Sequence, residues 1–198
     1  IINTGDTVLQ IQGVVSGSLN YIFTQINQQH SFSRSVLNAK KLGYTEPDPR
    51  EDLSGRDVAR KIVTLARELN MDVSLESLQF ESLVPKALED VPALEFIQRL
   101  PEFDHYFQDR LKELQSPQSI LSYTGKINTE TGNVSVGIEA IAKNHPLSSL
   151  EGTDNMIIFK TERYKEQPLI VRGPGAGAAV TASGIFADLS RLTSSLSS

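Results

Sequence analysis

The apolar residues of this 198-residue chain change their spacing three times, and the order of these changes restricts the possible folds most. From Thr7 to Val15 they alternate with a period of two, which is typical of a strand. From Leu19 to Leu69 they recur mainly at helical spacing, strand-like segments return after Ser119, and a last helical pattern follows. No strand–helix–strand unit repeats. The sequence therefore predicts an α+β domain with a mixed, largely antiparallel sheet that helices cover on one face.

Local signals place the individual elements. The expected helices cover residues 19–26, 33–42 (ended by Gly43), 54–69 (ended by Asn70) and about 180–192, with short helices in 85–115 that are interrupted at Pro92 and Pro101. The expected strands cover residues 7–15, 119–128, 133–142, 156–160 and 168–172, and the second and third form a hairpin. Ser54 and Asp57 match a capping box, and the Ser/Thr-rich end from Thr193 is expected to fray.

Composition excludes several classes of function. The chain has 19 basic and 24 acidic residues, a net charge of −5 and no run of Lys or Arg, so neither nucleic acid nor a membrane surface is expected as a partner. The absence of cysteine excludes disulfides, thiolate catalysis and Cys-ligated metals, and His30, His105 and His145 lack ligand spacing, so no metal site is expected. The chain starts at Ile1 without a signal-peptide pattern, and we expect it to be a piece of a longer cytoplasmic protein.

The segment Tyr44–Leu53, the acidic segment, is the first candidate site. It holds two prolines and four acids, which predicts a stiff loop that fixes its carboxylates before a ligand arrives. Asp57 and Lys61 follow, four residues apart on one helical face. Carboxylates can hold the ammonium of an amino acid, and a lysine beside them can transfer protons. The alternative is that these residues form only a helix cap and a surface ion pair.

Two glycine-containing turns are further candidates. In Gly13–Tyr21, which links a strand to a helix, Ser18 and Asn20 can bind a ligand or merely cap the helix. In Gly173–Thr181, backbone N–H groups can cradle a phosphate or carboxylate, although the spacing is not that of a dinucleotide fingerprint. Tight packing of the last helix against the sheet is the alternative there.

Three segments in this order, Gly13–Ile22, Lys41–Lys61 and Gly173–Asp188, resemble the substrate-binding and catalytic domain of homoserine dehydrogenase. The resemblance spans essentially the whole chain and is weakest in residues 76–118. It implies the interconversion of L-homoserine and L-aspartate 4-semialdehyde with NAD or NADP, in threonine and methionine biosynthesis.

The resemblance also implies roles for individual residues. Lys61 matches the proposed acid/base, with Asp57 as its catalytic neighbour. The other implied contacts are, for the substrate, Glu46, Asp52, Asp57, Tyr44, Gly17 and Ser18 and, for the cofactor, Gly177 and Gly175. At Ser18 the family usually has Thr, which also carries a hydroxyl.

This sequence lacks three features of the family: the N-terminal dinucleotide-binding domain with its glycine fingerprint, a catalytic lysine at the edge of that domain, and a monovalent-cation site in a loop that precedes the matching segment. The resemblance therefore implies that residues 1–198 are the catalytic and dimerisation domain of a longer enzyme, either monofunctional or fused to an aspartokinase. We expect the isolated chain to be inactive and to form a homo-oligomer through its sheet. Two alternatives remain open, a module that senses an amino acid without reaction and a purely structural dimerisation domain.

Overall fold

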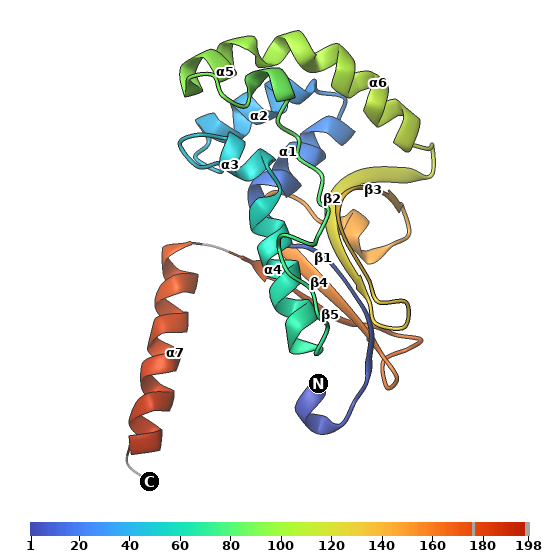
Figure 1. Cartoon of the computed structure of the whole chain (residues 1–198), viewed down its shortest axis with the longest axis vertical. Coiled ribbons are helices and arrows are strands. Elements are labelled where there is room, and N and C mark those ends of the chain that lie inside the picture. Colours follow the sequence, from blue (N-terminus) through green and yellow to red (C-terminus); the bar gives the residue numbers. More distant parts are fainter. Residues whose placement is uncertain (176, 197–198) are drawn as a thin grey trace.

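The computed structural model describes residues 1–175 and 177–196 and contains one five-stranded sheet of order β3-β2-β1-β4-β5 (Figure 1). Its strands are β1 (Val8–Val14), β2 (Ser119–Asn128), β3 (Asn133–Ala142), β4 (Asp154–Thr161) and β5 (Leu169–Pro174). All four neighbouring pairs are antiparallel. The predicted α+β class is confirmed, and the parallel component of the predicted mixed sheet is limited to an isolated bridge between Phe80 and Val136.

Two layers of helices cover one face of the sheet, and a further helix, α7 (Ala178–Leu196), stands apart from it (Figure 1). The layers contain α1 (Gly17–Asn27), α2 (Phe32–Lys41), α3 (Arg50–Leu53), α4 (Arg56–Glu68), α5 (Ala93–Arg99) and α6 (Asp104–Leu114). Short 3₁₀ turns lie at Ile2–Thr4, Lys86–Leu88, Leu100–Phe103 and Pro146–Ser149. Helices α1 and α4 contact β2, while α2 packs on α1 and α6 packs on α2, so α2, α5 and α6 form the outer layer (Figure 1). No helix in the described ranges is long and apolar enough to cross a membrane.

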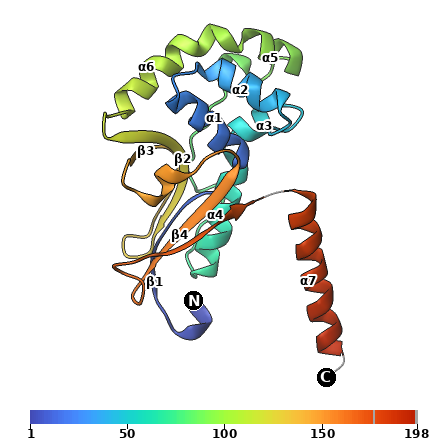
Figure 2. The ribbon, with the colours of Figure 1, turned by 180° about the vertical axis from the view of Figure 1, so that it is seen from behind.

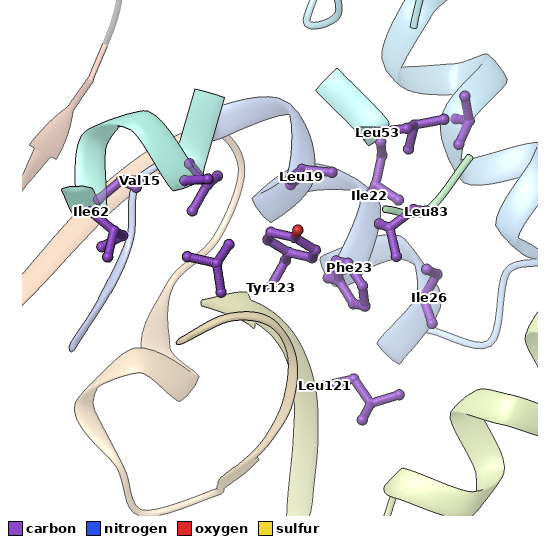
Figure 3. Close-up of a cluster of buried hydrophobic side chains, with 14 of the residues drawn as sticks. Val15, Leu19, Ile22, Phe23, Ile26, Leu53, Ile62, Leu83, Leu121 and Tyr123 are labelled. Carbon is purple, nitrogen blue, oxygen red and sulfur yellow. The ribbon is translucent and has the colours of Figure 1, made fainter. Parts of the chain in front are cut away.

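The main hydrophobic core lies between α1, α4 and the sheet. The predicted apolar stripe of α1 is buried there, and Figure 3 shows Leu19, Ile22 and Phe23 gathered around Tyr123 of β2. Tyr123 is only 2% exposed, and its hydroxyl donates a hydrogen bond to the carbonyl of Glu81. Burial of each such large side chain contributes about 1.5–3 kcal/mol, so these apolar contacts fix α1 on the sheet.

Two predictions for the segment before α4 are wrong. Arg50–Leu53 is not loop but a helical turn that starts after Pro49, because a proline with φ of −61° suits the start of a helix. The capping box is also absent. Gly55 is the N-cap of α4 with a left-handed φ of 71°, and no side chain caps the helix. Ser54 instead accepts a hydrogen bond from the Arg56 N–H at 3.2 Å.

The C-terminal helix differs from its prediction in length and position. The residues from Thr193 to Leu196 continue α7 instead of fraying, and residues 197–198 lie outside the described ranges. Figures 1 and 2 show α7 standing apart from the sheet, and Ile185, Phe186 and Leu189 are exposed on it. Packing of this helix against the sheet, the alternative considered for the glycine turn, is therefore not observed.

Candidate active site

The candidate segments meet at one hollow of about 390 Å³. The end of β1, the first turn of α1, the acidic segment, α4 and the strand ends of β4 and β5 all contribute to its wall. Its lining includes every residue to which the resemblance assigns a substrate, catalytic or cofactor role: Gly17, Ser18, Tyr44, Glu46, Asp52, Asp57, Lys61, Gly175 and Gly177. Residues up to 160 positions apart in the sequence therefore share one cavity, although this placement leaves their individual roles as predictions.

Lys61 is held in the hollow by two hydrogen-bonding partners. Its Nζ lies 2.8 Å from Oδ2 of Asp57, one helical turn earlier, and donates to the carbonyl of Val15 at 2.9 Å. An ammonium has three N–H donors, so one remains for a ligand. The side chain is 45% exposed, which means that a ligand can reach it.

Asp52 connects the acidic segment to the start of α1. Its Oδ1 accepts a hydrogen bond from Ser18 Oγ at 2.7 Å, and its Oδ2 accepts one from the backbone N–H of Glu46 at 2.9 Å. Ser18 Oγ lies 3.0 Å from Ser16 Oγ, which accepts a hydrogen bond from the Leu19 N–H and so caps α1. Asp52 and Ser18 thus position the backbone of Glu46 beside the first turn of α1.

The carboxylate of Glu46 is differently placed. It is exposed, and none of the described residues forms an ion pair or hydrogen bond with it. A carboxylate that is held over a hollow by its backbone, with both oxygens open, is suited to bind a cation from a ligand.

Arg50 anchors the segment Tyr44–Leu53 beside the hollow, and no local sequence pattern marks it. Its guanidinium binds Asp48 in a two-pronged ion pair, with Nη2 2.6 Å from Oδ2, and lies 5.4 Å from the ring of Phe96. Its Nη1 donates to the backbone carbonyls of Leu88, Glu89 and Val91. The hydrogen bond from Arg50 holds the pKa of Asp48 below its usual range. Asp48 therefore belongs to a clamp that fixes the acidic segment, not to the hollow.

Two asparagines behave differently from what the sequence indicated. Asn20, for which the sequence leaves ligand binding and helix capping open, is buried and donates through Nδ2 to the carbonyls of Gly152 and Asp154, so it ties α1 to β4. Asn155 was not singled out, yet it lines the hollow, and its Oδ1 is buried without a hydrogen-bond partner among the described residues. No local pattern marks it, because only strand pairing brings it to the cavity.

A second hollow of about 490 Å³ adjoins the first. The two share Val15, Lys61, Asn155, Pro174 and Gly175. The remainder of the second hollow is mainly apolar, with side chains from α4, β4 and β5. Lys61 thus stands between a polar and an apolar space.

The histidines lie away from both hollows. His145 accepts a hydrogen bond from the Leu147 N–H at 3.2 Å, and burial lowers its pKa. Among residues 1–175 and 177–196, no three His, Asp or Glu side chains gather in a way that could hold a metal ion.

Comparison with known proteins gives the family. The family model described as homoserine dehydrogenase matches residues 1–190. A bifunctional aspartokinase/homoserine dehydrogenase of Zea mays is 47% identical over 99% of this chain and 21% of its own length. The homoserine dehydrogenase of Saccharomyces cerevisiae is 44% identical over 99% of this chain and 56% of its own length.

Solved structures agree with this assignment. A Candida auris protein of unknown function has a TM-score of 0.90 and 43% identity over 98% of this chain and 55% of its own. A homoserine dehydrogenase of S. aureus has a TM-score of 0.71 and 25% identity over 94% of this chain and 43% of its own. The chain spans about a fifth of the maize relative and about half of the yeast relative. With a family match over residues 1–190 and a shared fold, the chain belongs to the homoserine dehydrogenase family.

Proposed function

We propose that residues 1–198 are the substrate-binding and catalytic domain of a longer protein that interconverts L-homoserine and L-aspartate 4-semialdehyde with NAD or NADP. One observation carries the proposal, namely that Lys61 shares a hollow with the open carboxylate of Glu46. This arrangement matches an amino acid that is bound by its ammonium at one end and reacts at the other.

In this mechanism the carboxylate of Glu46 receives the substrate ammonium, and Asp52 keeps Glu46 in place through its backbone. Asp57 and the carbonyl of Val15 orient Nζ of Lys61. In its neutral amine form Lys61 takes the proton of the substrate hydroxyl during oxidation, and the resulting ammonium returns a proton during reduction. A bound nicotinamide would supply the hydride acceptor for oxidation and the hydride donor for reduction.

The second hollow fits the flat, weakly polar ring of a nicotinamide, because its wall is mainly apolar and it meets the first hollow at Lys61. Gly175 and Gly177 precede α7, and their backbone permits close approach of a cofactor. Whether NAD or NADP is preferred is set outside these residues in the proposed enzyme.

Replacement of Lys61 by alanine in the complete protein tests the proposal. A catalytic lysine predicts that kcat falls by about 10²-fold or more with little change in KM. A module that only senses the amino acid predicts altered affinity without turnover, and a structural dimerisation domain predicts neither effect. Lys143→Ala, an exposed lysine outside both hollows, is the matched control and is expected to leave kcat unchanged. The isolated 198-residue chain is expected to show no turnover.

We also propose that the protein forms a homo-oligomer through the face of the sheet opposite the helices. A hydrogen-bonded group of polar side chains covers part of that face: Glu139 accepts from Gln12, Thr124 and Lys126. Sedimentation at two concentrations tests this association. A cytoplasmic location stays a prediction, and the names of the maize relatives include the word chloroplastic.

A further inference from the structure

The junction of the two hollows contains a polar side chain that the proposed mechanism does not use. Five residues line both spaces, and of these only Lys61 and Asn155 have side chains with hydrogen-bonding groups. If an amino acid occupies the polar hollow and a nicotinamide the apolar one, the reacting carbon lies at this junction. The reacting oxygen therefore lies near both side chains.

The carboxamide of Asn155 is not engaged by the chain itself. No described residue forms a hydrogen bond with it, and its Oδ1 is enclosed without a partner. Buried polar groups in folded proteins are nearly always paired, and an exception calls for a reason such as a role in catalysis. Structural asparagines in this fold look different, since Asn20 uses its amide for two backbone carbonyls.

The backbone opposite Asn155 is shaped to admit its amide. Asn155 in β4 pairs with Gly173 of β5, and the chain then passes Gly175. A Cβ atom at position 175 would lie 1.7 Å from Nδ2 of Asn155, closer than any two nonbonded atoms can approach. Nδ2 therefore lies against Gly175, which lines both hollows, while Oδ1 is the enclosed end of the amide.

We propose that the carboxamide of Asn155 binds the substrate oxygen that changes between hydroxyl and carbonyl, as a second group beside Lys61. This inference rests on the proposed function. During oxidation the hydroxyl proton passes to Lys61 and the hydride passes from the carbon to the nicotinamide, so negative charge develops on the oxygen before the carbonyl is complete. The N–H of Nδ2 stabilises that charge, and it binds the carbonyl oxygen in the reverse direction.

The test uses the complete enzyme with Asn155→Ala and Asn155→Asp, and with Asn144→Ala as a control at an exposed position. Loss of one such donor lowers kcat by about 10²-fold or more. We expect that loss in both variants, with KM for L-homoserine changed less than kcat and no loss for Asn144→Ala. Asn155→Asp keeps the shape of the side chain and adds a carboxylate that favours protonated Lys61. Its rate of oxidation should therefore rise at higher pH than that of the wild type.

Three results would overturn the inference: a kcat of Asn155→Ala within twofold of the wild type, a loss confined to cofactor affinity, or an unshifted pH profile in a folded Asn155→Asp variant. A merely structural role would lower thermal stability without moving the pH profile. If the complete wild-type enzyme fails to oxidise L-homoserine, the proposed function itself is refuted and this inference falls with it. If the wild type is active and Asn155→Ala matches it, only the inference fails.

Discussion

Gly55→Ala is expected to destabilise the fold through two separate effects. Gly55 joins α3 to α4 with φ 71° and ψ 0°, a left-handed conformation that L side chains rarely adopt. An added Cβ would also lie 1.9 Å from the hydroxyl oxygen of Tyr123 and 3.0 Å from the carbonyl oxygen of Glu81. The hydroxyl cannot simply move away, because it is buried and donates its hydrogen bond to that same carbonyl.

The magnitude follows from adding these effects. The left-handed conformation costs a non-glycine residue about 1–2 kcal/mol. Forcing an extra carbon into a packed site costs about 1–3 kcal/mol more. The free energy of unfolding should therefore fall by about 2–5 kcal/mol, which is a large part of the stability of a typical domain.

Gly132 provides the matched control for this prediction. It has nearly the same φ, 69°, but a Cβ there would meet nothing within 4 Å. Gly132→Ala should thus cost only the conformational part, about 1–2 kcal/mol. Urea denaturation followed by circular dichroism measures both variants. An equal loss of stability in the two variants would refute the argument that contact with Tyr123 requires glycine at position 55.

Three further predictions concern the residues that hold the site in place. Arg50→Lys should lower the free energy of unfolding by about 2–3 kcal/mol, because lysine cannot reproduce the two-pronged ion pair and the carbonyl contacts. A urea midpoint equal to that of the wild type would contradict this prediction. The pKa of Asp48 is lower in the folded state than the value of about 3.9 that it has in the unfolded chain. The Asp48 carboxylate therefore stabilises the fold above about pH 3.9, and this contribution is lost as the pH falls through the pKa of the folded state. When the free energy of unfolding is measured at decreasing pH, it should therefore decline less steeply for Asp48→Asn than for the wild type. The control Asp72→Asn, at an exposed position, should decline like the wild type. Asn20→Ala should cost about 1–3 kcal/mol because the carbonyls of Gly152 and Asp154 lose their buried donor, whereas thermal denaturation of Asn144→Ala should match the wild type.

The elements of this fold follow largely from local patterns in the sequence. The stripe from Leu19 to Ile26 predicted α1, and the alternation from Asn133 to Ala142 predicted the outer strand of the hairpin. The start of α4 did not follow in this way. Ser54 and Asp57 have the spacing of a capping box, but the left-handed turn at Gly55 replaces it, and that turn fits around Tyr123, a residue far away in the sequence.

The residues of the site also differ in how far local sequence patterns reveal them. The acidic segment and Lys61 could be recognised because proline, carboxylate and lysine occur at high density within a short stretch. Arg50 and Asn155 could not, because their environments depend on distant segments: the carbonyls of residues 88–91 for Arg50, and the pairing of β4 with β5 for Asn155. Local sequence therefore reveals groups that cluster along the chain better than groups that distant segments bring to the site.

The proposed reacting groups and the residues that fix the backbone around them should respond differently to mutation. The ion pair between Asp57 and Lys61 is about half exposed, and such pairs contribute only about 0.2–1 kcal/mol to stability. The clamp at Arg50 and the bond between Ser18 and Asp52 are more buried and fix the backbone of the acidic segment. Changes at Lys61 should consequently remove the proposed reaction while the protein stays folded, and changes at Arg50 should lower stability before they alter the reacting groups. If a Lys61 variant unfolded, the shape of the hollow would depend on Lys61 itself, contrary to the geometry described above.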